Sequence, residues 1–183
     1  SIDISLKDLS TFLGKEITRE NLESEALLWV KGEIDGEQGD LLKIDCKDSN
    51  RPDLWSTEGI ARALSPFYTK ERGIRKYEAE SSSVYIHIDR SVDEVRPYIT
   101  AAVLTNLHIT EELLKQLIQI QEKVSMSFGR KRKTVGIGIY DFDMITPPLR
   151  YKAFKPTELK YIPLGFTKEM SLKEVLEKHP KGK

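Results

Sequence analysis

The stretch Asn50–Leu64 reads NRPDLWSTEGIARAL, and its first half predicts a tight polar turn. Pro52 fixes its own φ and disfavours helical backbone at Arg51, the residue before it. Asn50 and Asp53 carry short polar side chains that hydrogen-bond to nearby backbone in turns. We therefore expect Asn50, Arg51, Pro52 and Asp53 to form a structural turn.

The second half of the same stretch predicts a helix. Ser56 is a favourable N-cap residue, and Ile60, Leu64 and Phe67 follow it at helical spacing. Apolar side chains at this spacing lie on one face, which a helix buries against the rest of a domain. The helix is expected to extend to about residue 68.

Toward the N-terminus, the sequence predicts two more helices and two strands. A helix is expected over residues 5–14, because three leucines share one face and Gly14 is a good residue to end it. A second helix is expected from a cap at Thr18 to about residue 26. Strands are expected at 27–34 and 41–46, joined by a turn rich in glycine and charge.

Toward the C-terminus, residues 71–83 predict a linker, because they are charge-rich and then serine-rich and lack apolar periodicity. Alternating apolar residues and helix caps return after it. The expected strands are 84–88, 98–107, 135–140 and 149–154, and the expected helices follow caps at Thr110 and Ser171.

The fold class expected from this order of elements is α+β. It consists of a small α+β domain at 1–70, the linker at 71–83, and the first part of a second, mixed α/β domain at 84–183. The last expected helix has no further strands to cover, so the second domain is expected to be incomplete. We therefore expect the chain to be the N-terminal portion of a longer polypeptide.

Composition limits the classes of function. Lys plus Arg and Asp plus Glu both number 29 in 183 residues, so any attraction to nucleic acid must come from a local patch. No apolar run reaches the roughly 20 residues needed to cross a bilayer, and no signal-peptide pattern is present, so no membrane contact and a cytoplasmic location are expected. Cys46 is the single cysteine, so neither an internal disulfide nor a thiolate zinc site is expected.

Two blocks of sequence carry a resemblance to a known family. An Asn-Arg-Pro-Asp turn that leads into a Glu-Gly-hydrophobic-Ala-Arg helix resembles the N-terminal region of the phenylalanyl-tRNA synthetase β chain, archaeal/eukaryotic type. A second block, at 117–143, reads LIQIQEKVSMSFGRKRKTVGIGIYDFD and is similar to the start of the editing domain in the same chains. The likeness extends from Ile4 to about Lys178 and is weakest around 71–83.

This resemblance implies an aminoacyl-tRNA synthetase subunit that takes part in protein biosynthesis. Such enzymes attach phenylalanine to tRNA(Phe) in an ATP-dependent reaction, and they are typically α₂β₂ assemblies. The α chain carries the chemistry that needs ATP and Mg²⁺, while the β chain holds a site that hydrolyses mischarged tyrosyl-tRNA(Phe). The resemblance therefore implies an α-subunit partner, a tRNA partner, no cofactor in this segment, and a segment that is inactive alone because the editing site continues beyond residue 183.

Gln121 is a candidate for the editing pocket. It places an amide on a largely apolar helix face, near Leu117 and Val124. A buried amide needs hydrogen-bond partners, and bonding within the core is one explanation. In the family pattern this position also lines the editing pocket, where the amide would bond a substrate carbonyl or a positioned water. The neighbouring Gln119 is expected to be solvated.

The basic run at 130–133 is the strongest local charge feature, and it has two explanations. Basic side chains just beyond a helix C-terminus stabilise the helix dipole and stay solvated. Alternatively, they enter the strand expected at 135–140, so that alternation points one pair toward a pocket and the other toward solvent or a phosphate backbone. The resemblance favours the pocket for Arg132. The candidates for tRNA phosphate contact are Arg130, Lys131 and Lys133.

Other polar clusters give weaker indications. Gly136 and Gly138 allow a ligand or a packed helix to approach a strand, and the sequence lacks the helix that a dinucleotide loop needs. Asp141 and Asp143 have no third ligand nearby, so a solvated turn is favoured over a Mg²⁺ site. No metal site and no catalytic triad are predicted.

Three hypotheses about function follow. The first, which we favour, is a β-chain portion that contributes part of an editing site. The second is a non-catalytic module that binds tRNA or another subunit through its N-terminal domain and basic run. The third is a free-standing deacylase, which hydrolysis by this chain alone would reveal.

Overall fold

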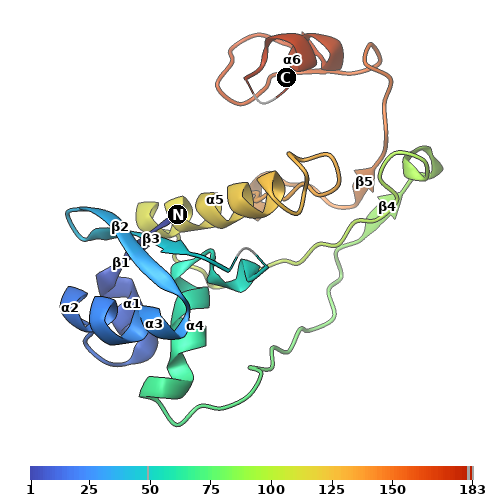
Figure 1. The fold of residues 1–183 in the computed structure, drawn as a ribbon. Coiled ribbons are helices and arrows are strands. Elements are labelled where there is room, and N and C mark those ends of the chain that lie inside the picture. The colour runs from blue at the N-terminus through green and yellow to red at the C-terminus, as the bar shows by residue number, and fades with distance from the viewer. Residues whose placement is uncertain (49, 181, 183) are drawn as a thin grey trace. The chain divides into compact units, whose positions relative to one another are not determined.

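A computed structural model describes the chain at residues 1–48, 50–180 and 182, and Figure 1 shows its helices and strands. The chain divides into two units. Unit 1 combines Ser1–Glu78 with Thr105–Ile139, and unit 2 combines Ala79–Leu104 with Tyr140–Lys183. Residues 181 and 183, at the end of the predicted second domain, lie outside the described residues.

Unit 1 contains an antiparallel sheet of three strands, β1 (Ile2–Ser5), β2 (Gly32–Gln38) and β3 (Leu41–Cys46), in the order β1-β3-β2. Side chains alternate between the faces of a sheet, so the register decides which residues share a face. Ile2 of β1 lies opposite Ile44 of β3. These two residues and the apolar residues on the same face of the two strands point into the core, whereas the residues between them are exposed. An irregularity between residues 34 and 36 shifts the register of β2 against β3.

Helical segments precede β2 and follow β3 along the chain. The first, α1 (Leu6–Leu13), begins at Ser5, whose hydroxyl accepts a hydrogen bond from the Asp8 amide, and it ends at Gly14 as predicted. The next helical run is capped by Thr18 as predicted, and it consists of α2 (Arg19–Asn21), a π-helical turn (Leu22–Ala26) and α3 (Leu27–Trp29). Helix α4 (Thr57–Tyr68) follows the sheet strands.

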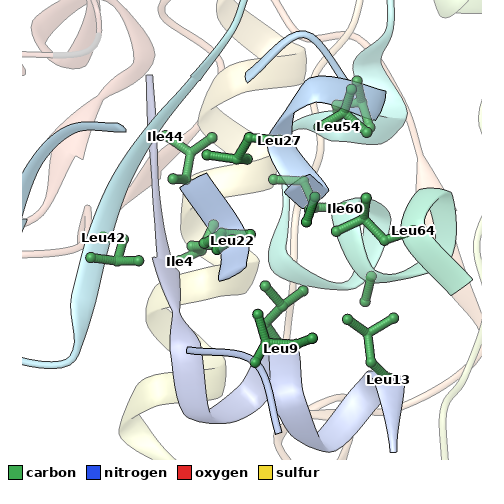
Figure 2. Close-up of a cluster of buried hydrophobic side chains, with 14 of the residues drawn as sticks. Ile4, Leu9, Leu13, Leu22, Leu27, Leu42, Ile44, Leu54, Ile60 and Leu64 are labelled. Carbon is green, nitrogen blue, oxygen red and sulfur yellow. The ribbon is translucent and has the colours of Figure 1, made fainter. Parts of the chain in front are cut away.

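The core of unit 1 lies between the sheet and these helices. Figure 2 shows Ile4, Leu42 and Ile44 of the sheet pointing toward leucines of α1, α3 and α4. Ile4, Leu9, Ile44 and Leu64 are completely buried. Each fully buried aliphatic side chain contributes about 1.5–3 kcal/mol by its removal from water, so this cluster is the main source of stability in unit 1.

Helix α5 (Glu111–Met126) belongs to unit 1 through two glutamine side chains. The Gln119 amide group donates to the Asp3 carbonyl oxygen over 2.9 Å and accepts from the Asp3 N–H over 2.7 Å. Gln116 donates to the Asp8 carboxylate over 2.7 Å. Gln119, expected to be solvated, is half-buried, and its amide pairs with the outer edge of β1 as a further strand would.

The division into units differs from the predicted one, which placed everything after residue 83 in a second domain. Residues 105–139 contact unit 1, and the reason is the pair of glutamines on α5. Hydrogen bonds between segments that are 116 residues apart leave no periodic trace in the sequence. The predicted domain boundaries at residues 70 and 83 therefore stay predictions.

Several predicted strands are wrong. The segment predicted as a strand at 27–34 starts with α3, and β2 begins only at Gly32, while β1 was not predicted. Residues 98–107 and 135–140 have no strand structure, although they are apolar. A strand needs a hydrogen-bonded neighbour, and no described strand pairs with either segment.

Unit 2 contains short elements. A parallel pair joins β4 (Ile86–Ile88) to β5 (Leu149–Tyr151), and the Tyr151 hydroxyl donates to the Arg96 carbonyl oxygen. An antiparallel pair joins β6 (Lys160–Tyr161) to β7 (Met170–Ser171). Helix α6 (Leu172–Lys178) follows, and single 3₁₀ turns occur at Arg90–Val92 and Phe142–Met144. Across the described ranges, no helix has the length and apolar character that a bilayer crossing requires.

The capping box predicted at Ser171 and Glu174 is confirmed, and it makes α6 sensitive to acid. The Ser171 N–H donates to the Glu174 carboxylate, as does Lys178, and these bonds lower the Glu174 pKa from 4.5 to about 2. A carboxylate with a lowered folded-state pKa stabilises the fold above its unfolded-state pKa and stops doing so as pH falls through the folded one. We therefore expect the first turn of α6 to loosen between about pH 4.5 and 2.

An NMR titration of the Glu174 side chain, with amide exchange measured along α6, tests this expectation. In Glu174→Gln, the opening of the first turn of α6 should no longer depend on pH in this range. Glu177, which is exposed and lies about one turn further along the helix, serves as the control. Titration of Glu174 near 4.5 would contradict the capping box as the cause.

Candidate functional site

The turn at 50–53 folds onto itself as the sequence predicted. Pro52–Leu54 forms a single 3₁₀ turn, and the Leu54 side chain is buried in the core. The Arg51 guanidinium donates to both oxygens of Asp53, over 2.9 and 2.8 Å. This pairing lowers the Asp53 pKa, so the carboxylate is charged at neutral pH. Both side chains are used within the turn, in keeping with a structural role.

The turn is fixed to α4 by a close backbone approach. The Ser56 hydroxyl accepts from the Gly59 N–H over 3.1 Å, as expected for an N-cap. The Asp53 carbonyl oxygen lies so near Gly59 that a Cβ at that position would overlap it. A side chain is therefore excluded at Gly59, and the turn and helix form one rigid piece.

Gln121 contributes its amide to the backbone of a later segment. Its Nε2 donates to the Ile137 carbonyl oxygen over 2.6 Å, and the residue is half-buried. The bond holds the glycine-containing segment 136–138 against α5. Of the two explanations for this amide, the structure shows an internal hydrogen bond, and it leaves the amide oxygen available as an acceptor.

The basic run is a left-handed turn, so the predicted alternation of its side chains is wrong. Arg130, Lys131 and Arg132 have φ values of 47, 57 and 65°. This conformation is uncommon for residues other than glycine and must be held by its surroundings. The turn brings amides of 127–134 back over the last carbonyl groups of α5, which helices otherwise leave without partners.

Four backbone hydrogen bonds hold this turn on α5. Gly129 lies where a Cβ would overlap the Ser125 carbonyl oxygen and come within 2.6 Å of the Val135 oxygen. The Ser125 side chain is buried beneath the turn. The bonds run from the amides of Ser127, Gly129, Lys131 and Arg132 to the carbonyl oxygens of Lys123, Val124, Met126 and Ser125, respectively.

Arg132 is the residue of the run that turns back onto the helix. Its guanidinium forms an ion pair with Glu122 and contacts the Met126 sulfur at 3.5 Å. Arg132 is half-buried, whereas Arg130, Lys131 and Lys133 are exposed. The structure therefore separates Arg132 from the other three basic residues by its burial, and its role in an editing pocket stays a prediction.

Two further contacts surround this turn. Phe128 lies against Trp55, which follows the 3₁₀ turn Pro52–Leu54, with ring centroids 6.1 Å apart, so the NRPDLW stretch and the basic turn are neighbours in unit 1. A shallow hollow of about 450 Å³ lies beside Glu122, lined also by Gln119, Lys123, Met126 and Ser127. Neither Gln121 nor Arg132 lines this hollow directly. Glu122 lines the hollow and also forms the ion pair with Arg132.

The sequence did not indicate Glu122 as a site residue. It lies ten positions before Arg132, on a helix where charged residues are common, and only the reversal of the chain at 127–132 brings the two together. Asp141 caps a 3₁₀ turn by accepting from the Asp143 N–H, in keeping with a solvated turn. In the part of the chain that the structure describes, no three His, Cys, Asp or Glu side chains gather as metal ligands would.

The sequence of this chain is similar to those of several known proteins. No family model matches the chain. The phenylalanine–tRNA ligase β subunit of Thermococcus gammatolerans is 46% identical over 185 residues, covering 99% of this chain and 32% of the relative. That of Pyrococcus furiosus is 45% identical, covering 99% of this chain and 33% of the relative. This chain thus spans about a third of the length of these relatives.

A solved structure agrees with these relatives. The crystal structure of an N-terminal fragment of the phenylalanyl-tRNA synthetase β subunit from Pyrococcus horikoshii has a TM-score of 0.90 and 44% identity. The likeness covers 99% of this chain and 53% of that one, and both are α+β. The resemblance read from the NRPDLW turn and the basic block is thereby confirmed: the chain matches the N-terminal portion of archaeal phenylalanine–tRNA ligase β subunits.

Proposed function

We propose that this chain is the N-terminal part of the β subunit of a phenylalanine–tRNA ligase, which attaches phenylalanine to tRNA(Phe) at the expense of ATP. The observation that supports this most directly is the 44–46% identity along 99% of the chain, together with the shared fold. The partners proposed are an α subunit, in an α₂β₂ assembly in the cytoplasm, and tRNA(Phe). ATP and Mg²⁺ serve the assembled enzyme, and no residue proposed here binds them.

We further propose that Gln121 and Arg132 contribute to a site that hydrolyses tyrosyl-tRNA(Phe). Such a site is needed because a hydrophobic pocket rejects an added hydroxyl only weakly. Ester hydrolysis requires an oriented water and stabilisation of the developing oxyanion. The Gln121 amide oxygen can accept a hydrogen bond from the water, and the Arg132 guanidinium supplies positive charge whose direction Glu122 fixes.

A second candidate function is a non-catalytic module that binds tRNA or a neighbouring subunit. The observation in its favour is the exposure of Arg130, Lys131 and Lys133 on one rigid turn, while Arg132 is engaged by Glu122. Exposed cations on a fixed backbone bind phosphates without reading the sequence of the RNA.

Hydrolysis of tyrosyl-tRNA(Phe) by the β subunit assembled with its α subunit distinguishes these functions. Arg132→Ala is expected to slow hydrolysis about a hundredfold, because a lost oxyanion donor typically costs that much. Phenylalanylation should be unchanged, and Arg130→Ala is the matched control, since it removes an exposed arginine of the same turn. The 183-residue chain alone is expected to be inactive.

Two outcomes would contradict the editing proposal. One is unchanged hydrolysis in Arg132→Ala, with tRNA affinity and its salt dependence reduced when the exposed basic residues are neutralised. This result would establish the binding module instead. The other is full hydrolysis by the 183-residue chain alone, which would show a complete site within it and favour a free-standing deacylase.

A further inference from the structure

Two aromatic rings are stacked on the surface of unit 1, outside the site described above. Trp29, at the end of α3, and Phe67, in the last turn of α4, have ring centroids 4.2 Å apart and planes inclined by only 20°. Their side chains remain 60% and 50% exposed. Each ring therefore covers one face of the other and leaves its outer face accessible.

The core does not require these rings. Leu27 and Leu64, their neighbours along α3 and α4, are buried and already join the two helices to the core. Burial of the adjacent residues fixes both backbones, and so it fixes the place of the rings. Leu28, between Leu27 and Trp29, is 71% exposed, so the apolar surface continues beyond the pair.

Positive charge gathers where α4 ends beside this stack. Residues 70–76 read KERGIRK, with four basic residues and one acidic residue. The acidic one, Glu71, is paired with Arg75 over 2.7 Å. The Arg72 guanidinium donates to the carbonyl oxygens of Thr69 and Glu71, which keeps it at the C-terminal end of α4, close in sequence to Phe67.

A further cation lies on the same end of α4. The Lys15 ammonium group sits 4.7 Å from the centroid of the Tyr68 ring, next to Phe67 in the sequence. Acidic residues are also present: Glu25, one helical turn before Trp29, acts on the Tyr68 hydroxyl, and Asp48 pairs with Lys31. The segment that follows α4 is therefore basic on balance, and it begins three residues after Phe67.

We propose that the Trp29–Phe67 pair is a stacking platform for the bases of single-stranded RNA, with the phosphates held by the basic segment 70–76. A base placed on the outer face of either ring continues the existing stack, because the rings are nearly parallel. Stacking on aromatic side chains beside a basic groove is how sequence-tolerant single-strand binding works. The basic segment favours RNA over a protein partner, whose apolar surface would need no cations.

This inference adds an RNA contact to the proposed function and does not use Gln121 or Arg132. Its failure is therefore distinguishable from failure of the editing proposal. Hydrolysis variants report on the basic turn at 130–133, whereas variants of Trp29 and Phe67 report on the stack. Either result leaves the other unaffected.

The test uses Trp29 as its own reporter. Trp29 and Trp55 are the two tryptophans of the chain, so Trp55→Phe leaves Trp29 as the single source of tryptophan fluorescence. A single-stranded RNA of about twelve nucleotides, within the usual length for such surfaces, is titrated into the 183-residue chain. We expect the fluorescence to be quenched on binding, and a duplex of the same sequence to bind more weakly.

Variants then separate stacking from general apolar contact. Trp29→Ala and Phe67→Ala are expected to weaken binding about tenfold to a hundredfold, and Trp29→Tyr should retain most of it. Leu28→Ala is the matched control, an exposed apolar residue of the same helix, and it should change little. Lys70→Ala with Arg72→Ala should reduce the dependence of binding on salt.

Two results would overturn the proposal. If the RNA does not quench Trp29, or binds Trp29→Ala as tightly as the parent chain, the stack is not an RNA surface and is left for a protein partner. If Leu28→Ala weakens binding as much as Trp29→Ala, the contact is apolar and not stacking. Helical content measured by circular dichroism shows whether each variant is folded, and Phe67→Ala gives the answer if Trp29→Ala is not folded.

Discussion

Gly59→Ala is expected to destabilise unit 1 by about 3 kcal/mol or more, a large fraction of the free energy of unfolding of a typical domain. A Cβ at this position would overlap the Asp53 carbonyl oxygen, and that oxygen belongs to a turn held by the Arg51–Asp53 pair. Neither the turn nor α4 can move without disturbing Leu54, which is buried. Urea unfolding followed by circular dichroism measures the loss.

The direction of this effect is informative. Helix propensity alone predicts that alanine in place of an interior helix glycine stabilises by about 1 kcal/mol, the opposite sign. Gly36→Ala is the matched control, because a Cβ there meets nothing within 4 Å. A Gly59→Ala chain as stable as the Gly36→Ala chain would show that the turn does not approach α4 closely.

Gly129→Ala is expected to open the basic turn and cost about 2–3 kcal/mol, since overpacking against backbone cannot relax through a side chain. The added Cβ would overlap the Ser125 carbonyl oxygen, which is the acceptor for the Arg132 amide. Loss of that bond releases Arg132 from its left-handed conformation and from Glu122. If the editing proposal holds, hydrolysis of tyrosyl-tRNA(Phe) should fall as far as in Arg132→Ala.

Amide exchange at Arg132 measures the opening directly. Ser127→Ala is the control within the same turn, because it removes only a hydroxyl that bonds back to the Lys123 carbonyl oxygen. Exchange should be faster by a large factor in Gly129→Ala and nearly unchanged in Ser127→Ala. Slow exchange in both variants would contradict the role assigned to Gly129.

Helix ends were predictable because their signals are local. Ser56, Thr110 and Ser171 each accept a hydrogen bond from an amide three residues later, and each begins a helix where the sequence placed it. Such caps need only a few consecutive residues. The polar turn at 50–53 belongs to the same class, since Arg51 and Asp53 satisfy each other.

Strands were less predictable because pairing is not local. The strand expected at 27–34 is largely wrong: Leu27 and Leu28 are helical, and the true strand is the glycine-containing, charged segment Gly32–Gln38. Its polar composition suits an edge strand with one face in water. The apolar segment at 98–107 would suit a strand by composition, yet it has no partner within the described ranges.

The candidate site shows the same limit. The sequence identified 130–133 as a charged segment just beyond the end of α5. No sequence signal predicts that three consecutive residues, none of them glycine or asparagine, adopt a left-handed conformation. The ion pair of Arg132 with Glu122 depends on that reversal. The roles of Gln121 and Arg132 in editing stay predictions for the hydrolysis experiment.

We expect the double hydrogen bond between Gln119 and Asp3 to form late in folding. Its partners are 116 residues apart, and closing a loop of that length costs about 4 kcal/mol of chain entropy, more than the short β2–β3 hairpin costs. Contacts of such separation form late, after local ones have reduced the freedom of the chain. The sheet with α1 and α4 should therefore fold first, and α5 should dock last. The basic turn that α5 carries would reach its place beside Trp55 only in that final step.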